Sequence, residues 1–297
     1  MRIAHLSDLH LKDAGDVIWL ERQLDCIARQ QPDHLAITGD LLDRWMPSLL
    51  TRVLDALAAR NLLEAGRTTI LHGNHDLASS GGHPRGRADL WRLGLRFWDP
   101  PPLISRRRRR FHDLVAARAP GVSGTAPFIK AAGSGARVAV LDTVPLSWVP
   151  FTIERGSIVL RHAIGAVPAA QQAWLVAQRE GAAPLVVLMH HYPVGMPSFQ
   201  WSPAGRVARA PAVVVPMHVP QVDQDAFWNA AQAAGVRLVL CGHVHRARLE
   251  WLRGIAVGLN GESGAAWAGR TIAWYDLSHD QVTMRLERGD DQLPADS

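Results

Sequence analysis

The chain of 297 residues contains little cysteine, little lysine and no long apolar run. Its only cysteines, Cys26 and Cys241, are too few and too far apart for a disulfide framework, which indicates a reducing compartment. No stretch approaches the roughly 18 uninterrupted apolar residues of a membrane-spanning helix. The opening segment MRIAHLSDLH lacks the apolar core of a secretory signal. These absences predict a cytoplasmic protein with no transmembrane segment and leave its oligomeric state unknown.

The positive net charge has two interpretations, binding of an anionic partner or no binding role. Apolar residues make up 47% of the chain, which excludes wholesale disorder. The net charge is +5, and nearly all basic residues are arginine, because Lys12 and Lys130 are the only lysines. Such a balance suits an anionic substrate or nucleic acid. It is equally compatible with an arginine-rich composition that has no binding role.

Short apolar runs alternate with longer amphipathic runs, a pattern typical of βα units in an α/β fold. The expected strands are 2–6, 34–38, 68–72, 138–142, 184–189 and 236–241. The expected helices are 17–30, 47–60, 168–180 and 223–235. Segments 249–260, 271–277 and 281–287 alternate with period two and predict antiparallel strands. We expect one domain over 1–287, with irregular inserts at 77–136 and 192–222 and a flexible tail at 288–297.

Side chains able to bind metal follow five of the expected strands. They are Asp8 and His10, Asp40 and Asp43, Asn74 with His75 and Asp76, His190 with His191, and His243 with His245. In open α/β sheets, ligand sites gather outside the carboxyl ends of the strands. The segment GNHD at 73–76 could be an ordinary turn on its own, but turn chemistry has no reason to recur at strand ends. The recurrence predicts a functional site.

The residue types indicate the metal chemistry. Carboxylate, imidazole and amide ligands without cysteine suit manganese, iron or zinc ions. A carboxylate can bridge two ions about 3.5–4 Å apart, and such a pair clamps both the attacking and the leaving oxygen at phosphorus. A bound ion also lowers the pKa of water from about 15.7 to about 7, which supplies hydroxide. We therefore expect two divalent metal ions as cofactors.

The ordered motifs D-x-H, G-D-x-x-D, G-N-H-D, a lone histidine and G-H-x-H resemble those of the calcineurin-like metallophosphoesterase superfamily. The resemblance runs from Asp8 to His245. It implies an α/β fold with a central two-sheet β-sandwich flanked by helices, in four layers. It also implies a dinuclear enzyme that hydrolyses phosphoesters by attack of a metal-bound hydroxide.

The resemblance assigns roles to individual residues. One metal would be held by Asp8, His10, Asp40 and His245. The other would be held by Asp40, Asn74, His190 and His243, so that Asp40 bridges the pair. His75 corresponds to a general acid or phosphate-contacting histidine, and with Asp40 it completes the expected catalytic residues. Asp43 and Asp76 would orient the ligand histidines, and His191 would lie behind the ligands or face the substrate.

Structural roles compete with these assignments. Asp8 and Asp43 could each be helix N-caps, and any single histidine is more often a satisfied core residue. The register of five motifs argues against this for the whole set. This argument does not extend to the remaining histidines, which lie outside the motifs. We expect structural roles for His5, His34, His72, His83, His112, His162, His218 and His279. Cys241 is expected to be a small buried residue.

The motif forms are most similar to the bacterial cyclic-nucleotide and glycerophosphodiester phosphodiesterases. A small phosphodiester or nucleotide-like molecule is therefore the expected substrate. A pyrophosphatase of UDP-sugar lipids and a DNA nuclease are alternatives within the superfamily, and nucleic acid is a less favoured partner. A non-catalytic scaffold is least favoured, because no ligand position is degraded.

Two further segments leave alternatives open. The basic run from Arg106 to Arg110 could bind phosphate groups, or it could be a solvated face of a helix that continues through FHDLVAAR. Phe199 and Trp201 could wall a substrate pocket, or they could pack a long loop against the domain.

Overall fold

The computed structural model describes residues 1–79, 99–133, 135–149, 151–161, 163–179, 183–195, 199–201, 213–215, 217, 219–261, 263–264, 271–279 and 281–288. His83, His162, His218, the side chains of Phe199 and Trp201, parts of both predicted inserts and the tail after 288 lie outside this description.

Two large mixed sheets form the centre of the fold. The first has the order β15-β14-β1-β2-β3, with β1 (Arg2–Leu6), β2 (His34–Thr38), β3 (Thr68–Leu71), β14 (Thr271–Leu277) and β15 (Val282–Arg288). The second has the order β12-β13-β11-β8-β5-β4, with β4 (Phe128–Ala131), β5 (Arg137–Val140), β8 (Leu185–Leu188), β11 (Val236–Cys241), β12 (Ala247–Leu252) and β13 (Ile255–Asn260). Strands β1, β2 and β3 run parallel, as do β5, β8, β11 and β13. The antiparallel pairing predicted for the C-terminal strands is confirmed.

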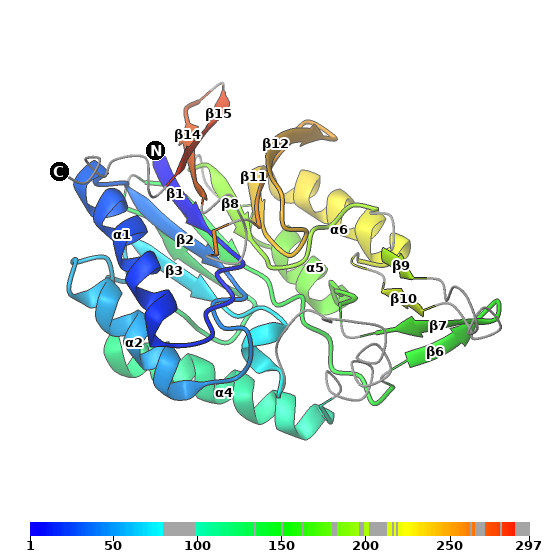
Figure 1. Ribbon diagram of the computed structural model, residues 1–297. Helices are drawn as coiled ribbons and strands as arrows, with labels where there is room; N and C mark the ends of the chain where they lie inside the picture. The colour runs from blue at the N-terminus through cyan, green and yellow to red at the C-terminus, as the bar shows by residue number, and fades with distance from the viewer. Residues whose placement is uncertain are drawn as a thin grey trace.

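The sheets face each other across a shared apolar core that includes Ile3, Leu71, Val186 and Leu238. Helices α1 (Ala14–Gln30), α2 (Pro47–Ala58) and α4 (Pro101–Arg118) cover the outer face of the first sheet, and α5 (Ala169–Val176) and α6 (Gln221–Ala234) cover the second (Figure 1). The predicted four-layer arrangement of helices around two sheets is therefore confirmed. None of the helices in the described part of the chain combines the length and apolarity needed to cross a membrane.

The helix ends explain where sequence and structure differ. Helix α1 begins three residues earlier than its apolar periodicity indicates, because the Asp13 carboxylate caps it by accepting the Gly15 and Asp16 N–H groups. Helix α2 begins at Pro47, as expected. Its N-cap residue is Met46, whose side chain forms no capping hydrogen bond. Neither Asp8 nor Asp43 caps a helix, so the competing N-cap interpretation of these two residues is wrong.

A third, smaller sheet was not expected. It has the order β6-β7-β10-β9, formed by β6 (Phe151–Glu154), β7 (Ser157–Leu160), β9 (Phe199–Trp201) and β10 (Val213–Val215). Its strands are three or four residues long, too short for period-two alternation to stand out. The predicted insert 77–136 is also less irregular than expected, because it contains α4 and β4.

Two arginines of the basic run attach α4 to the rest of the fold. The Arg107 Nη1 group donates to the Leu77 carbonyl at 2.7 Å and to Asp99 at 2.9 Å. The Arg108 Nε atom lies 3.0 Å from the Asp142 carboxylate, and its Nη2 donates to the Val144 carbonyl. Burial alone would raise the pKa of Asp142, but His72 and Arg108 lower it to about 2 from the ordinary 3.8.

This ion pair predicts a pH-dependent contribution to stability. Because the folded-state pKa of Asp142 is depressed, its contribution is present above pH 4 and is lost as the pH falls through about 2. Asp142→Asn is expected to lower the free energy of unfolding by about 2 kcal/mol at pH 7 and by about 1 kcal/mol at pH 3. Urea unfolding at the two pH values measures this. Asp55→Asn, which removes an exposed pair with Arg118, is the control and should cost less than about 0.5 kcal/mol. A loss that does not shrink at pH 3 would contradict the role of the charge.

Candidate metal centre

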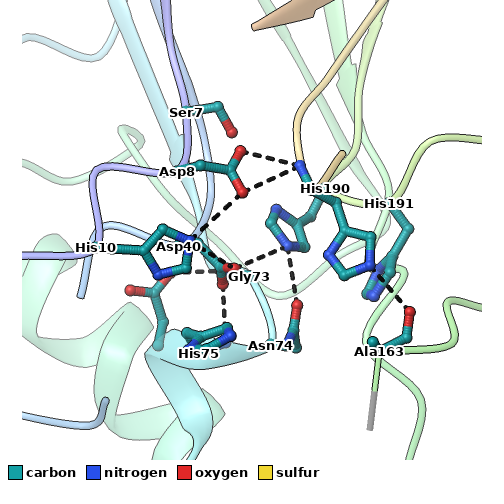
Figure 2. A network of polar contacts seen from close by, with 12 residues as sticks. Ser7, Asp8, His10, Asp40, Gly73, Asn74, His75, Ala163, His190 and His191 are labelled. Carbon is teal, nitrogen blue, oxygen red and sulfur yellow. Dashed lines mark hydrogen bonds and ion pairs between the residues drawn. The ribbon is translucent and has the colours of Figure 1, made fainter. Parts of the chain in front are cut away.

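Side chains from the ends of five strands meet at one edge of the two sheets (Figure 2). The residues brought together are Asp8 and His10 after β1, Asp40 after β2, Asn74 and His75 after β3, His190 after β8, and His243 and His245 after β11. The convergence follows from topology, because parallel neighbours end at the same sheet edge and the two sheets face each other.

Asp8 lies at the centre of a first cluster. Its Oδ1 atom is 3.3 Å from the His245 Nε2 and 3.8 Å from the His10 Nε2, and these two imidazole nitrogens are 3.2 Å apart. The backbone N–H of His243 donates to both Asp8 oxygens, at 2.9 and 3.1 Å. The carboxylate is therefore fixed by the loop that follows β11 while it faces two histidine side chains.

Asp40 lies between this cluster and a second one. Its Oδ2 atom is 3.4 Å from the His190 Nε2 and 3.8 Å from the His10 Nε2. The His190 Nε2 is also 3.0 Å from the Asn74 Oδ1, while its Nδ1 donates to the Thr38 carbonyl at 2.8 Å. That carbonyl orients the ring so that Nε2 points toward Asp40 and Asn74. Asp40 thus contacts histidines that belong to both clusters.

A backbone carbonyl and a hydroxyl group fix two other rings, which sequence reasoning could not have found. The His243 Nε2 pairs with the Ala163 carbonyl at 2.9 Å, so Nδ1 is the nitrogen left for the centre. The His191 Nδ1 pairs with the Thr143 hydroxyl at 2.9 Å, and the His191 ring centroid lies 4.3 Å from that of His243. His191 is fully buried beside the centre, and its Nε2 has no hydrogen-bond partner among the described residues.

Asp43 and Asp76 support the two loops that carry Asp40 and Asn74. The Asp76 carboxylate accepts the Leu42 and Gly73 N–H groups, each at 2.8 Å. Burial raises the pKa of Asp76 to about 7. The Asp43 carbonyl accepts from the His75 Nδ1 at 3.0 Å, and the Asp43 carboxylate lies 4.0 Å from the His10 Nδ1. Asp76 therefore acts on backbone groups, and Asp43 faces two histidines.

The charges of the centre are unusual for a protein interior. Asp8 and Asp40 are both fully buried, which by itself would raise the pKa of each. The surrounding histidines outweigh burial and hold the pKa of both carboxyls well below the usual range. The same pairing raises the pKa of His190 to about 9, because Asp40 outweighs the burial of the ring. The ion pairs of these carboxylates within the described residues are all to histidines. Buried anions surrounded by nitrogen and amide-oxygen donors fit the binding of cations.

The backbone at this centre is strained. Asp8, His10, Asp40, His243 and His245 all have left-handed φ values, of 54°, 45°, 51°, 70° and 46°. Side chains with a Cβ atom disfavour this region by about 1 kcal/mol each. Such residues persist only where surrounding contacts enforce the conformation, and they gather at functional sites.

The strain predicts an order of stability for two variants of His245. His245→Gly is expected to be more stable than His245→Ala by about 1 kcal/mol, because glycine accepts φ of 46° without steric cost. Denaturant unfolding of the two purified variants measures the difference. At an ordinary right-handed position the order is reversed, since alanine restricts the unfolded chain. An alanine variant of equal or greater stability would show that the backbone here is relaxed.

The glycines of the motifs allow the carboxylates to approach. A Cβ atom on Gly73 would overlap the Asp40 carboxylate, and one on Gly242 would overlap the Asp8 carboxylate and the Ser7 hydroxyl. Gly73 of the GNHD segment must therefore be glycine because the Asp40 carboxylate occupies the space of a Cβ atom, independently of any turn that Gly73 forms.

Comparisons with known proteins agree with this architecture. The sequence profile of the calcineurin-like phosphoesterase family matches residues 1–247. Among solved structures, a dimetal phosphatase from Danio rerio is similar with a TM-score of 0.59 at 12% identity, over 97% of this chain and 96% of that one. A protein of Thermus thermophilus is similar with a TM-score of 0.52 at 15% identity, over 96% and 97% of the two chains. No curated protein sequence matches the chain significantly.

Proposed function

The chain belongs to the calcineurin-like phosphoesterase family, and from this premise we propose that it is a dinuclear metal-dependent phosphodiesterase. The observation that supports this most directly is the position of Asp40, whose Oδ2 atom lies 3.4 Å from His190 and 3.8 Å from His10. A carboxylate between two clusters of donors is the arrangement that a bridging ligand requires.

The proposed ligand sets follow the two clusters. Asp8, His10, Asp40 and His245 would hold one divalent cation, and Asp40, Asn74, His190 and His243 would hold the other. The mixture of carboxylate, imidazole and amide donors suits manganese, iron or zinc. When bound, such a pair of cations lowers the pKa of coordinated water and neutralises charge on phosphoryl oxygens.

His75 is the proposed proton donor to the leaving group. Its Nδ1 donates to the Asp43 carbonyl, which fixes the ring and leaves Nε2 as the nitrogen that can carry the exchangeable proton. The His75 ring lies edge-on to that of His10, with centroids 4.7 Å apart, and is partly exposed. His75 can therefore reach a substrate oxygen beside the centre. One of its ring nitrogens also lies within 4.8 Å of ligand atoms of His10 and Asp40, so metal content is the measurement that separates a proton donor from a ligand.

The preference for diesters rests on the arginines. A monoester carries nearly two negative charges at neutral pH and gains from cations around its free oxygens. Arg44 and Arg246, which follow Asp43 and His245 in sequence, are both exposed. Arg107 and Arg108 are occupied by the contacts that attach α4. A diester, with a single charge, makes no such demand on the centre.

The proposal is tested with a substrate panel in the presence of Mn²⁺. We expect kcat/KM for bis-p-nitrophenyl phosphate to exceed that for p-nitrophenyl phosphate, and we expect Arg246→Ala to change the ratio little. Metal analysis should find two ions per chain. A tenfold preference for the monoester would overturn the diester assignment. A protein that binds no metal and hydrolyses neither compound would overturn the enzymatic assignment as well.

A further inference from the structure

A groove of about 500 Å³ is lined by residues of helix α4, of the beginning of helix α2 and of the segment before α2. Helices α2 and α4 lie side by side (Figure 1). Its lining is strongly basic: Arg106, Arg107, Arg109 and Arg110 from α4, with Trp45, Pro47, Leu103 and Asp113. The volume is that of a site for a small molecule.

Three of these arginines differ from Arg107 and Arg108, which attach α4 to the fold. Arg106, Arg109 and Arg110 are exposed and form no ion pair with another described residue, in contrast to Arg107 and Arg108. Arg106 and Arg110 are four residues apart on one helix and therefore project from the same face. Placing several like charges side by side is unfavourable unless an anion lies between them. Their exposure agrees with the solvated helix face considered from the sequence.

The helix that forms the opposite wall also attracts anions. Helix α2 is 12 residues long, has no side-chain cap at Met46 and has no acidic residue in its first turn. Its dipole places partial positive charge at the end where Pro47 lines the groove. The arginines and the helix end come from separate parts of the sequence and converge on the same space.

The groove lies next to the candidate metal centre. Trp45, in its wall, is two residues along the chain from Asp43, whose carbonyl accepts from the His75 Nδ1, so the Cα atoms of Trp45 and Asp43 are at most about 7 Å apart. The Trp45 N–H donates to the Ala78 carbonyl at 2.8 Å, and Arg107 donates to the Leu77 carbonyl. Both walls are thereby attached to the turn that carries His75.

We propose that this groove binds a second phosphate group of the substrate, so that the preferred substrates are small phosphodiesters that also carry a terminal phosphate. This inference rests on the proposed function, since it places the scissile phosphodiester at the metal centre. A terminal phosphate has close to two charges and three acceptor oxygens, which match several guanidinium groups. The groove holds one such group with its linker, and this distinguishes it from the extended basic track that a nucleic-acid strand requires.

The test compares substrates that differ in one group. Thymidylyl-thymidine contains one phosphodiester, and its 5′- and 3′-phosphorylated forms add a terminal phosphate at either end. With the Mn²⁺-loaded protein, we expect at least one phosphorylated form to have kcat/KM at least tenfold higher, mainly through a lower KM. Ratios within twofold for both forms would overturn the proposal. So would a steady gain with the length of oligothymidylates that lack terminal phosphates, which would indicate strand binding.

Variants assign the effect to the groove. In Arg106→Ala/Arg110→Ala the preference should fall to within twofold, while turnover of bis-p-nitrophenyl phosphate, which has no second phosphate, should stay unchanged and so report correct folding. The matched control Arg52→Ala/Arg118→Ala removes the same charge elsewhere on the surface and should keep the preference. A preference that survives in the groove variant, or that is lost in the control, would overturn the proposal.

Failure of the proposed function would be recognised separately. If the wild-type protein hydrolyses none of these compounds, calorimetric titration with the same three dinucleotides replaces kcat/KM by Kd. The same tenfold and twofold criteria, and the same variants, then decide whether the groove binds a terminal phosphate.

Discussion

Replacing Asp40 with asparagine is expected to remove both metal ions and to lower kcat/KM on bis-p-nitrophenyl phosphate by at least about a thousandfold. Asp40 is fully buried and lies between His10 and His190, so its charge serves both clusters. The loss of several kcal/mol of metal-ion catalysis corresponds to that factor. Asparagine keeps the size of the side chain, and it tolerates the left-handed φ of 51° at this position better than alanine does. The change therefore tests the charge more than the fold.

Metal content by elemental analysis and steady-state kinetics are the two readouts. Asp13→Asn is a matched control, because it makes the same atomic change at the N-cap of α1, where asparagine is an equally good cap. It should keep two ions per chain and normal turnover. An Asp40→Asn protein that retains both ions and wild-type activity would remove Asp40 from the bridging position.

His75→Ala is expected to keep both metal ions and to lose roughly 10²–10⁴ in rate on diesters with alkyl leaving groups, the usual effect of removing a positioned acid. The His75 side chain contacts the Asp43 carbonyl, and its backbone N–H donates to Asp40 at 2.8 Å, an interaction that alanine preserves. Diesters of p-nitrophenol need no proton on the leaving oxygen, so their hydrolysis should be slowed much less. His279→Ala, at an exposed position, is the control. A variant that loses metal would place His75 among the ligands.

The same residue predicts a pH dependence. Burial lowers the pKa of His75, so the imidazolium that can protonate a leaving group is a minority species at neutral pH and increases as the pH falls. The ratio of alkyl-diester to p-nitrophenyl-diester hydrolysis should therefore rise with falling pH in the wild type. The ratio removes effects on metal binding that are common to both substrates. It should be flat in His75→Ala, and a flat wild-type profile would argue against proton donation by this ring.

The sequence predicted the parts of the fold that depend on local pattern. The apolar run of 34–38 and the periodic segment that starts at Pro47 became β2 and α2 with few changes, because a strand buried on both faces and an amphipathic helix are each encoded locally. The order of strands and loops in the sequence also predicts that side chains such as Asp8 and Asp40, which follow parallel strands, lie at one edge of the sheet.

Long-range contacts account for what could not be predicted. The pairing of β7 with β10 joins residues more than fifty positions apart through strands too short to recognise. The Thr38 and Ala163 carbonyls that orient His190 and His243 are backbone atoms and leave no trace in residue type. The same holds for the groove at α4, because a run of arginines does not reveal which of them the fold occupies.

The left-handed backbone at five site residues has an evolutionary consequence. At about 1 kcal/mol each, these conformations together cost about 5 kcal/mol, comparable to the entire net stability of many domains. Glycine at any of the five would relieve part of this cost. A lineage freed from selection for the chemistry of the centre would thus gain stability by drifting toward glycine at these positions. This chain has aspartate or histidine at all five positions, so its backbone bears this cost in full.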